Sequence, residues 1–269
     1  MPATPTIVDH QTWLQQRDEL LDREKAHTRE GDAIAASRRR LPMTEIPNVE
    51  LIGEDGPVRL LDIFDGRDQL VVYKHMFHLG KPFEEQCEGC TISQWNFQEA
   101  SYLNEEGVSY AVICEGPWEE VEPFRDFMGY TQPWYSAFGV DVPPFDGEYG
   151  SIASFLRHDD RAYLTYETTG RGVEAIMGTL KLLDMTVYGR QEAWEDSPAG
   201  WPQRPTYSFW RRDGRPTGQW TRPGVTAVDG SEHHCHGSTP TGGQPPDRGE
   251  FIVASRPVWA DQVPAGRGN

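Results

Sequence analysis

The sequence predicts an α/β fold with a central mixed sheet flanked by helices. Two β-rich runs, 70–73 and 108–114, are each followed by a segment of helical periodicity, and this alternation favours parallel strands joined by helices. Two further β-rich runs, 152–156 and 162–166, flank a short polar turn and precede another helical segment, which predicts a closing hairpin. A chain of 269 residues can bury a substantial core.

An N-terminal helical arm is predicted over residues 9–40. Asp9 can cap the helix, and many charged residues with good helix propensity follow it. The apolar stripe of the arm, which includes Trp13 and Leu20, is thin. Such an arm needs a surface to lie against, and two alternatives stay open: the main domain, or a second subunit in a homodimer.

A β-hairpin and a short helical turn are predicted next. Residues 49–52 and 58–60 read as strands around Asp55-Gly56, a pair typical of tight turns. Residues 61–64 then favour one helical turn before the strand at 70–73.

The two cysteines of a Cys-Glu-Gly-Cys sequence, Cys87 and Cys90, lie between that strand and the next helix. Apolar residues recur at helical spacing from Ile92 to Leu103, so the helix is expected to start at the cysteines and run through 104. Unpaired backbone N–H groups and the positive end of the helix dipole favour a thiolate at a helix N-terminus. The pattern therefore indicates Cys87 as a reactive thiol.

The remaining elements complete the expected order. A helix should begin at Pro117 and stop at Gly129, a loop should occupy 138–150, and the helix after the hairpin should begin near Gly172. From about residue 188 the composition changes to Trp, Pro, Gly and Arg, with short strands expected at 206–210 and 251–254. We predict three parts: the arm at 1–40, the α/β domain at 41–188 and an irregular C-terminal extension at 189–269.

Charge and cysteine content narrow the function classes. A formal net charge of −17 disfavours nucleic acid and anionic membranes, which attract basic surfaces. The first residues do not have the pattern of a secretory signal, and no stretch has membrane-spanning length, so we expect a cytoplasmic protein. Four cysteines do not form a disulfide framework in a chain of this length. Small molecules or proteins are the expected partners.

Several short motifs follow one another along the chain. They are Arg40-Leu41-Pro42, Asp62-Ile63-Phe64-Asp65-Gly66-Arg67, Val72-Tyr73-Lys74-His75-Met76-Phe77, Glu85-Gln86-Cys87-Glu88-Gly89-Cys90, Trp95-Asn96-Phe97, Met128-Gly129-Tyr130, Pro133-Trp134, Gly139, 163–170 and Leu182-Leu183-Asp184. In this order they resemble a bacterial family of thioredoxin-like proteins described as predicted dithiol-disulfide oxidoreductases and carried as a domain of unknown function. The likeness covers about residues 35–188 and implies a thioredoxin-like fold with a cysteine-pair activity, Cys87 and Cys90 being the positions that carry over. Glu88 and the loop at 77–83 depart from the expected pattern.

Two cysteines at this spacing can exchange with a disulfide, since Cys87 can attack and Cys90 can resolve the mixed disulfide. Half of a structural zinc site and two packed thiols are the alternatives for the pair. The acidic residues nearby, Glu84, Glu85 and Glu88, disfavour a thiolate while the helix N-terminus favours it, and the sequence leaves the balance open.

Other candidate residues have simpler interpretations. Cys114 ends a predicted strand, where a buried inert thiol is expected. His75 and His78 could reach the sulfurs as a proton donor or a metal ligand, although a structural role is expected for each.

A second signal is the tract His233, His234, Cys235 and His236. Imidazole and thiolate groups suit copper or zinc, but ligands this close in sequence bind one ion only with an irregular backbone, and a solvated loop is the alternative. Thiol exchange itself requires no cofactor.

The sequence thus favours a thiol-disulfide oxidoreductase that acts on a protein or small-molecule disulfide, or on a peroxide. The alternative is a copper- or zinc-binding protein or metalloenzyme on the same fold, using the cysteine pair, the 233–236 tract or both. A third hypothesis is a fold that binds without turnover.

Overall fold

The N-terminal arm is one long helix. The computed structural model of the chain describes residues 3–212 and 214–220, all within the compact unit Met1–Thr226. Helix α1 (His10–Arg38) begins as predicted, because the Asp9 carboxylate accepts the backbone N–H groups of Gln11 and Thr12. None of its residues is buried, and Trp13 and Leu20 are each 50% exposed. The homodimer through this arm stays a prediction.

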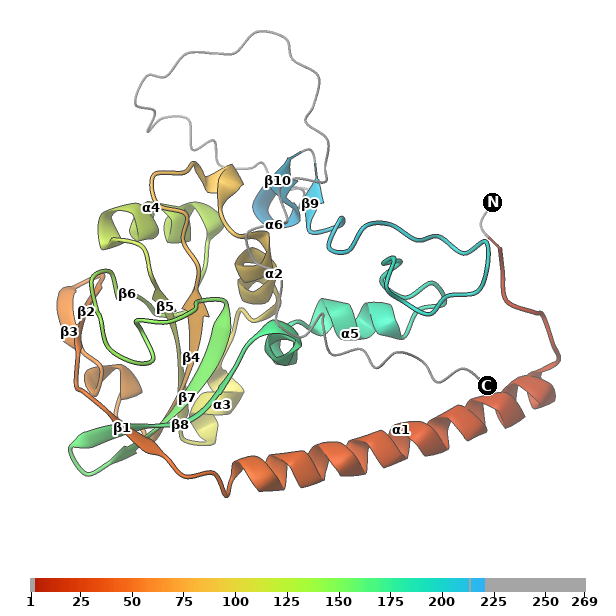
Figure 1. The fold of residues 1–269 in the computed structure, drawn as a ribbon, viewed down its shortest axis with the longest axis horizontal. Helices are drawn as coiled ribbons and strands as arrows, with labels where there is room; N and C mark the ends of the chain where they lie inside the picture. Colours follow the sequence, from red (N-terminus) through yellow and green to blue (C-terminus); the bar gives the residue numbers. More distant parts are fainter. Residues whose placement is uncertain (1–2, 213, 221–269) are drawn as a thin grey trace, which may run out of the picture. The chain divides into compact units, whose positions relative to one another are not determined.

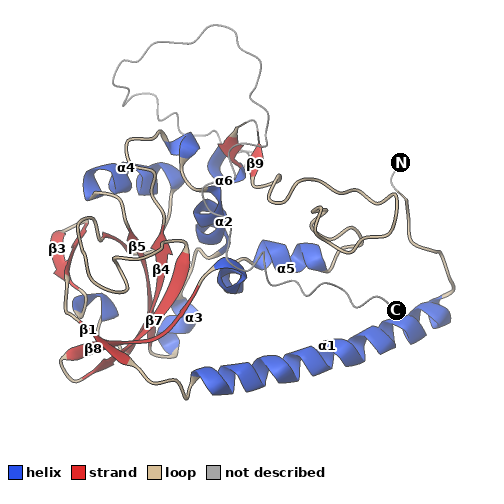
Figure 2. Ribbon diagram, viewed as in Figure 1, coloured by secondary structure: helices blue, strands red, loops and turns tan. Residues whose placement is uncertain are grey.

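An eight-stranded mixed sheet forms the centre of the described residues, in the order β1-β8-β7-β4-β5-β6-β2-β3 (Figures 1 and 2). Strands β4, β5 and β6 are parallel, and every other pairing is antiparallel. The strands are β1 (Thr44–Ile46), β2 (Glu50–Gly53), β3 (Gly56–Arg59), β4 (Gln69–His75), β5 (Val108–Cys114), β6 (Trp134–Ser136), β7 (Ser151–His158) and β8 (Arg161–Thr168).

The central part of this sheet has a thioredoxin-like topology. Strand β4 leads through α2 (Glu88–Asn96) and α3 (Ser101–Glu105) to its parallel neighbour β5, and α4 (Trp118–Met128) follows. The hairpin β7-β8 then pairs with the other side of β4, antiparallel to it. The 3₁₀ segment η3 (Gly170–Ile176) and helix α5 (Gly178–Asp184) close the unit. The predicted fold class is confirmed.

Two hydrophobic cores lie on the two faces of the sheet. One face packs against α2, α4 and α5, with Trp134, Phe124 and Leu180 among its most buried side chains. The other face packs against η1 (Asp62–Phe64) and the loop that carries Phe145, and side chains of β2 and β3 belong to the same core. Both cysteines of the pair pack in the first core, so the layer between sheet and helices positions them.

Two of the expected helices differ from the structure. The helix expected through 104 breaks after Asn96, because Phe97 leaves helical geometry and packs on Tyr110 with ring centroids 4.5 Å apart. The helix expected from Gly172 starts as the 3₁₀ segment η3 and becomes α-helical only at α5.

The expected strand at 206–210 is a series of turns. Tyr207 has a φ of +63°, and its ring stacks on Trp210 with a centroid separation of 4.0 Å. The short strands β9 (Arg211–Arg212) and β10 (Arg215–Pro216) and the helical turn α6 (Thr217–Trp220) follow instead. The expected strand at 251–254 lies outside the described residues.

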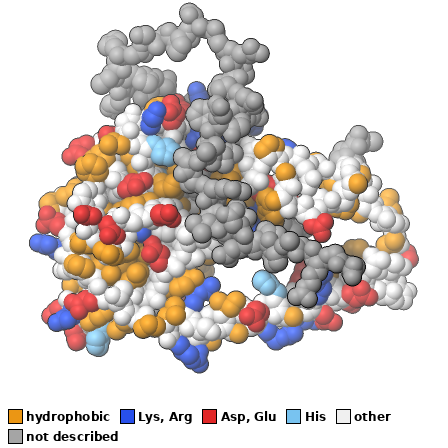
Figure 3. Space-filling model, viewed as in Figure 1, with side chains coloured by type: hydrophobic (Ala, Val, Ile, Leu, Met, Phe, Trp, Pro, Cys, Tyr) orange, Lys and Arg blue, Asp and Glu red, His pale blue; other side chains and the backbone are white. Residues whose placement is uncertain are grey.

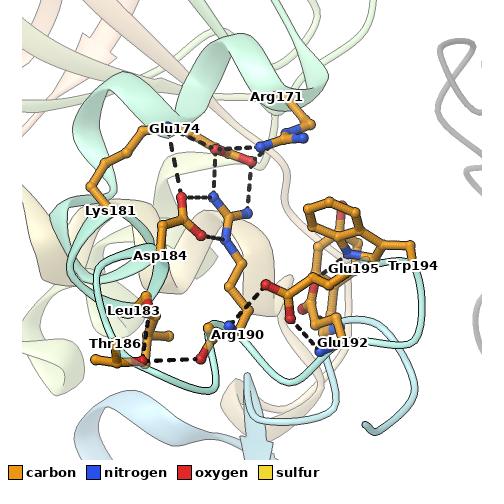
Figure 4. A network of polar contacts seen from close by, with 12 residues as sticks. Arg171, Glu174, Lys181, Leu183, Asp184, Thr186, Arg190, Glu192, Trp194 and Glu195 are labelled. Carbon is orange, nitrogen blue, oxygen red and sulfur yellow. Dashed lines mark hydrogen bonds and ion pairs between the residues drawn. The ribbon is translucent and has the colours of Figure 1, made fainter. Parts of the chain in front are cut away.

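The first part of the C-terminal extension is tied to the domain by a buried ion network (Figure 4). Arg190, whose side chain is 2% exposed, binds Glu174 at 2.9 Å and Asp184 at 2.7 Å. Burial by itself raises the pKa of Glu174, but hydrogen bonds and charges from Arg190 and Arg171 outweigh it and lower that pKa to about 2. The three-part division at 40 and 188 stays a prediction, yet this network joins the second and third parts.

Two further carboxylates, those of Glu192 and Glu195, hold the backbone of residues 190–207. The Glu192 carboxylate accepts the backbone N–H of Tyr207 at 2.8 Å, and Glu195 accepts the backbone N–H groups of Arg190 and Glu192 at 3.1 and 2.8 Å. The aromatic pair Tyr207–Trp210 is therefore connected to the Arg190 network through hydrogen bonds.

The Arg190→Met substitution should destabilise the protein by about 1.5–3 kcal/mol, since it takes the buried cation away from Glu174 and Asp184, while Arg171 and Lys181 still contact Glu174. Chemical denaturation measures the loss. Lys181→Met, which removes a lysine that is 58% exposed beside the same carboxylates, is the matched control and should have a small effect.

Glu174 has a pKa below its ordinary value of 4.5, so its stabilisation is present above pH 4.5 and is lost as pH falls toward 2. This acid-dependent loss should shrink in Arg190→Met; an unchanged pH dependence would contradict the network.

Candidate functional site

The cysteine pair occupies the start of α2, where the strand-to-helix connection ends. Cys87 is the N-cap residue, and its Sγ accepts the backbone N–H of Cys90 at 3.5 Å. Both cysteines are free thiols. Cys90 is 1% exposed and receives the backbone N–H of Met76 at 3.4 Å, whereas Cys87 is partly exposed. Cys87 is thus the more exposed residue of the pair.

The surroundings of Cys87 and Cys90 shift the pKa values of the two thiols in opposite directions. A hydrogen bond from the Cys90 side chain and the backbone N–H groups of Cys90 and Gly89 lower the pKa of Cys87, against the opposing effects of burial and of the Glu88 charge. Burial and the neighbouring Cys87 raise the pKa of Cys90 well above its ordinary value. Cys87 is therefore the thiol that ionises first.

The loop before the pair is fixed by Gln86, which is fully buried. Its amide oxygen accepts the backbone N–H of His78 at 2.9 Å, and its amide nitrogen donates to the carbonyls of His78 and Lys81 at 3.0 and 3.1 Å. Each of these bonds satisfies a loop backbone group that helix and sheet do not. The loop residue Cys87 therefore has a defined position.

A tyrosine closes the buried side of the pair. Tyr73, on β4, is 1% exposed and interacts with the Cys90 thiol. Burial raises the pKa of Tyr73 well above its ordinary value, and the charges of Cys90 and Cys87 add to this effect. The position of Tyr73 beside Cys90 depends on how β4 packs against α2, which the sequence pattern does not reveal.

The C-terminal extension supplies residues that the sequence gave no reason to connect with the cysteines. The Arg211 guanidinium donates to Glu88 Oε2 from Nε at 3.1 Å and from Nη2 at 2.9 Å. The neighbouring Trp210 ring lies over the first turn of α2, so a Cβ added to Gly89 would be 3.2 Å from that ring and 3.8 Å from the Cys87 Sγ. The acidic residue beside Cys87 is thus ion-paired.

The other sequence candidates lie apart from the exposed sulfur. His75 is fully buried with its Nδ1 4.0 Å from the Cys114 Sγ and its ring 4.8 Å from that of Trp134. Burial lowers the pKa of His75 to about 3, so it is neutral at physiological pH. Cys114 is buried, as expected, and burial raises its pKa. The His78 ring contacts the Glu85 carbonyl at 2.7 Å on the surface.

Metal ligands are not clustered in the described part of the chain. No group of three or more His, Cys, Asp and Glu side chains suited to a metal ion occurs within residues 3–212 and 214–220. The tract His233, His234, Cys235 and His236 lies outside these residues, and metal binding there stays a prediction. The described helices include none that is long and apolar enough to cross a membrane.

Among the three described cysteines, iodoacetamide at neutral pH should alkylate Cys87 well before Cys90 and Cys114, because Cys87 alone of these three combines partial exposure with a lowered pKa. Mass spectrometry of peptides after short exposure measures the order. Cys114→Ser should leave the early phase intact, and Cys87→Ser should remove it. Early labelling of Cys90 instead would show that the two thiols are assigned the wrong way round.

Comparison with solved structures finds proteins of similar arrangement. A putative thiol:disulfide interchange protein DsbE from Chlorobium tepidum is 17% identical, with 52% of this chain and 95% of that chain covered and a TM-score of 0.36. Peroxidoxin BcpB from Mycobacterium tuberculosis is 18% identical, with 53% and 97% covered and a TM-score of 0.37. No curated protein matches the sequence.

A family profile matches a much larger part of the chain. It is described as a bacterial protein of unknown function (DUF899) and covers residues 2–215, a wider range than the motifs at 35–188. The match includes α1, the cysteine pair and Arg211. The chain therefore belongs to this bacterial family, DUF899, as the motif resemblance predicted.

Proposed function

We propose that the protein is a thiol-disulfide oxidoreductase in which Cys87 is the nucleophile and Cys90 the resolving thiol. One observation supports the proposal: the residue Cys87 is partly exposed, its Sγ accepts the Cys90 backbone N–H at the N-terminus of α2 and its pKa is lowered, while Cys90 is buried. An outer thiolate with an inner thiol is the arrangement that two-step disulfide exchange needs.

In the first step, the Cys87 thiolate attacks one sulfur of a substrate disulfide. A mixed disulfide forms, and the other substrate sulfur leaves as a thiolate that takes a proton from water. In the second step, Cys90 loses its proton and attacks the Cys87 Sγ, which forms the Cys87–Cys90 disulfide and releases the second substrate thiol. Two electrons pass from the protein to the substrate, and an external dithiol returns the protein to its reduced form.

A peroxide is the variant substrate of the same site. The Cys87 thiolate would then break the O–O bond, become a sulfenic acid and release an alcohol or water. Attack by Cys90 on that sulfur would give the same intramolecular disulfide and release water.

The natural substrate, the cytoplasmic location and the absence of nucleic-acid and membrane partners remain proposals. In Figure 3 the acidic side chains are spread over the visible face of the described residues, which agrees with the sequence-level argument against polyanionic partners.

Cys90→Ser protein mixed with oxidised glutathione or with insulin should retain one substrate half as a disulfide on Cys87, because the resolving thiol is gone. Intact mass before and after reduction measures the adduct. Cys87→Ser should retain nothing, and Cys114→Ser should turn over as the native protein does. An adduct that persists in Cys87→Ser, or turnover without either cysteine, would contradict the assigned roles.

Elemental analysis of the same full-length protein tests the metal-binding alternative. Thiol exchange predicts trapping through Cys87 without stoichiometric copper or zinc, whereas a metal site built on the pair predicts bound metal that is lost in Cys87→Ser. Treatment with tert-butyl hydroperoxide followed by a sulfenic-acid reagent separates the peroxide variant from the disulfide one.

A further inference from the structure

Arg211 lies at the mouth of the cysteine pair although it is 123 residues from Glu88 in the sequence. Strand β10 and helix α6 contact α2 (Figure 1). Besides its two bonds to Glu88, the guanidinium donates to the carbonyls of Glu84 at 2.8 Å, Gln86 at 2.9 Å and Gly214 at 2.9 Å. The five N–H donors of an arginine side chain match these five bonds, so Arg211 has one well-defined position.

These contacts join a charge and a backbone segment that both border Cys87. Glu88 is the residue after Cys87, and its negative charge opposes ionisation of that thiol. Gln86 is the residue before Cys87, and Glu84 belongs to the preceding 3₁₀ turn η2 (Phe83–Glu85). The Arg211 guanidinium thus pairs with the Glu88 carboxylate after Cys87 and binds the backbone carbonyls of Glu84 and Gln86 before it.

We propose that Arg211 is a positioning residue of the thiol-exchange site, which keeps the Cys87 thiolate available at neutral pH by neutralising Glu88 and holding the loop that ends at Cys87. This proposal rests on the proposed function for its biological meaning, but its physical content, the reactivity of Cys87, is independent of any substrate. It also gives the first part of the C-terminal extension a role in the chemistry.

Other titratable groups around Cys87 do not substitute for Arg211. Tyr73 and Tyr130 face the pair from the core, and burial raises the pKa of both well above the ordinary value, so they stay neutral at physiological pH. Cys90 has a raised pKa as well. Glu88 carries the charge that raises the pKa of Cys87, and Arg211 is its ion-pair partner at 2.9 Å. Removal of Arg211 therefore leaves that charge uncompensated.

The anchoring of the segment supports a fixed rather than a transient contact. Gln219, 6% exposed, donates to the Phe127 carbonyl at 2.9 Å, and Thr217 donates to the Phe209 carbonyl at 2.7 Å. On the other side, Tyr207 is held by Glu192. Arg211 is thus supported from both directions along the chain.

The test is the pH profile of Cys87 alkylation in the Cys90→Ser, Cys114→Ser, Cys235→Ser background, in which Cys87 is the remaining cysteine. Arg211→Gln should raise the apparent pKa of Cys87 by about half a unit to one unit, which slows alkylation at neutral pH about three- to tenfold. Adding Glu88→Gln to Arg211→Gln should bring the profile back to the parent or below it, because the uncompensated carboxylate is then removed. Arg211→Lys, which keeps the charge, should stay nearer the parent than Arg211→Gln.

Arg212→Gln is the matched control, since Arg212 is an exposed neighbour with the same charge on the same strand. Circular dichroism and unfolding midpoints check that each variant is folded. An unchanged profile in Arg211→Gln, an equal shift in Arg212→Gln, or failure of Glu88→Gln to reverse the shift would each overturn the proposal. Failure of disulfide trapping with these shifts present would instead overturn only the proposed exchange activity.

Discussion

The structure of this site depends on one contact, the backbone N–H of Cys90 pointing at the Sγ of Cys87. It exists because the chain passes from the end of β4 through a fixed loop into the first turn of α2, where the N–H groups have no carbonyl partner in the helix. A thiolate is the natural acceptor for such donors. The sheet, the two cores and the loop hydrogen bonds of Gln86 all serve to keep this turn in place.

The same geometry gives Cys87 and Cys90, which have identical side chains, opposite pKa shifts. Cys87 is partly exposed and accepts hydrogen bonds, so its ionised form is favoured. Cys90 is buried in an apolar core beside Cys87, so its neutral form is favoured, although a hydrogen bond from Tyr73 acts in the opposite direction. A difference in environment, rather than in residue type, assigns the outer and inner roles in the proposed exchange. In our proposal Arg211 adds to this difference, because it compensates the Glu88 charge that raises the pKa of Cys87.

Much of the domain could be predicted from the sequence because it depends on local patterns. The runs around Val72 and Val112, the stop at Gly129 and the cysteines at a helix start follow from periodicity and capping, and the structure agrees. The break at Phe97 could not be predicted, since it depends on packing against Tyr110, a contact between separate elements. The pairing of Glu88 with Arg211 was equally hidden, because no periodicity connects residues 123 apart. The sequence alone therefore does not decide whether the pKa of Cys87 is raised or lowered. The family match over residues 2–215 is wider than the motif range 35–188.

The most direct measurement of the central claim is a pH titration of thiolate ultraviolet absorbance in the folded full-length protein, comparing the native chain with Cys87→Ser and Cys90→Ser. We expect one thiolate that forms below the ordinary cysteine pKa, is lost in Cys87→Ser and survives in Cys90→Ser, where the serine hydroxyl can still donate a hydrogen bond to it. A titration that is the same in Cys87→Ser as in the native protein would contradict it, since the outer sulfur would then not be the ionised one.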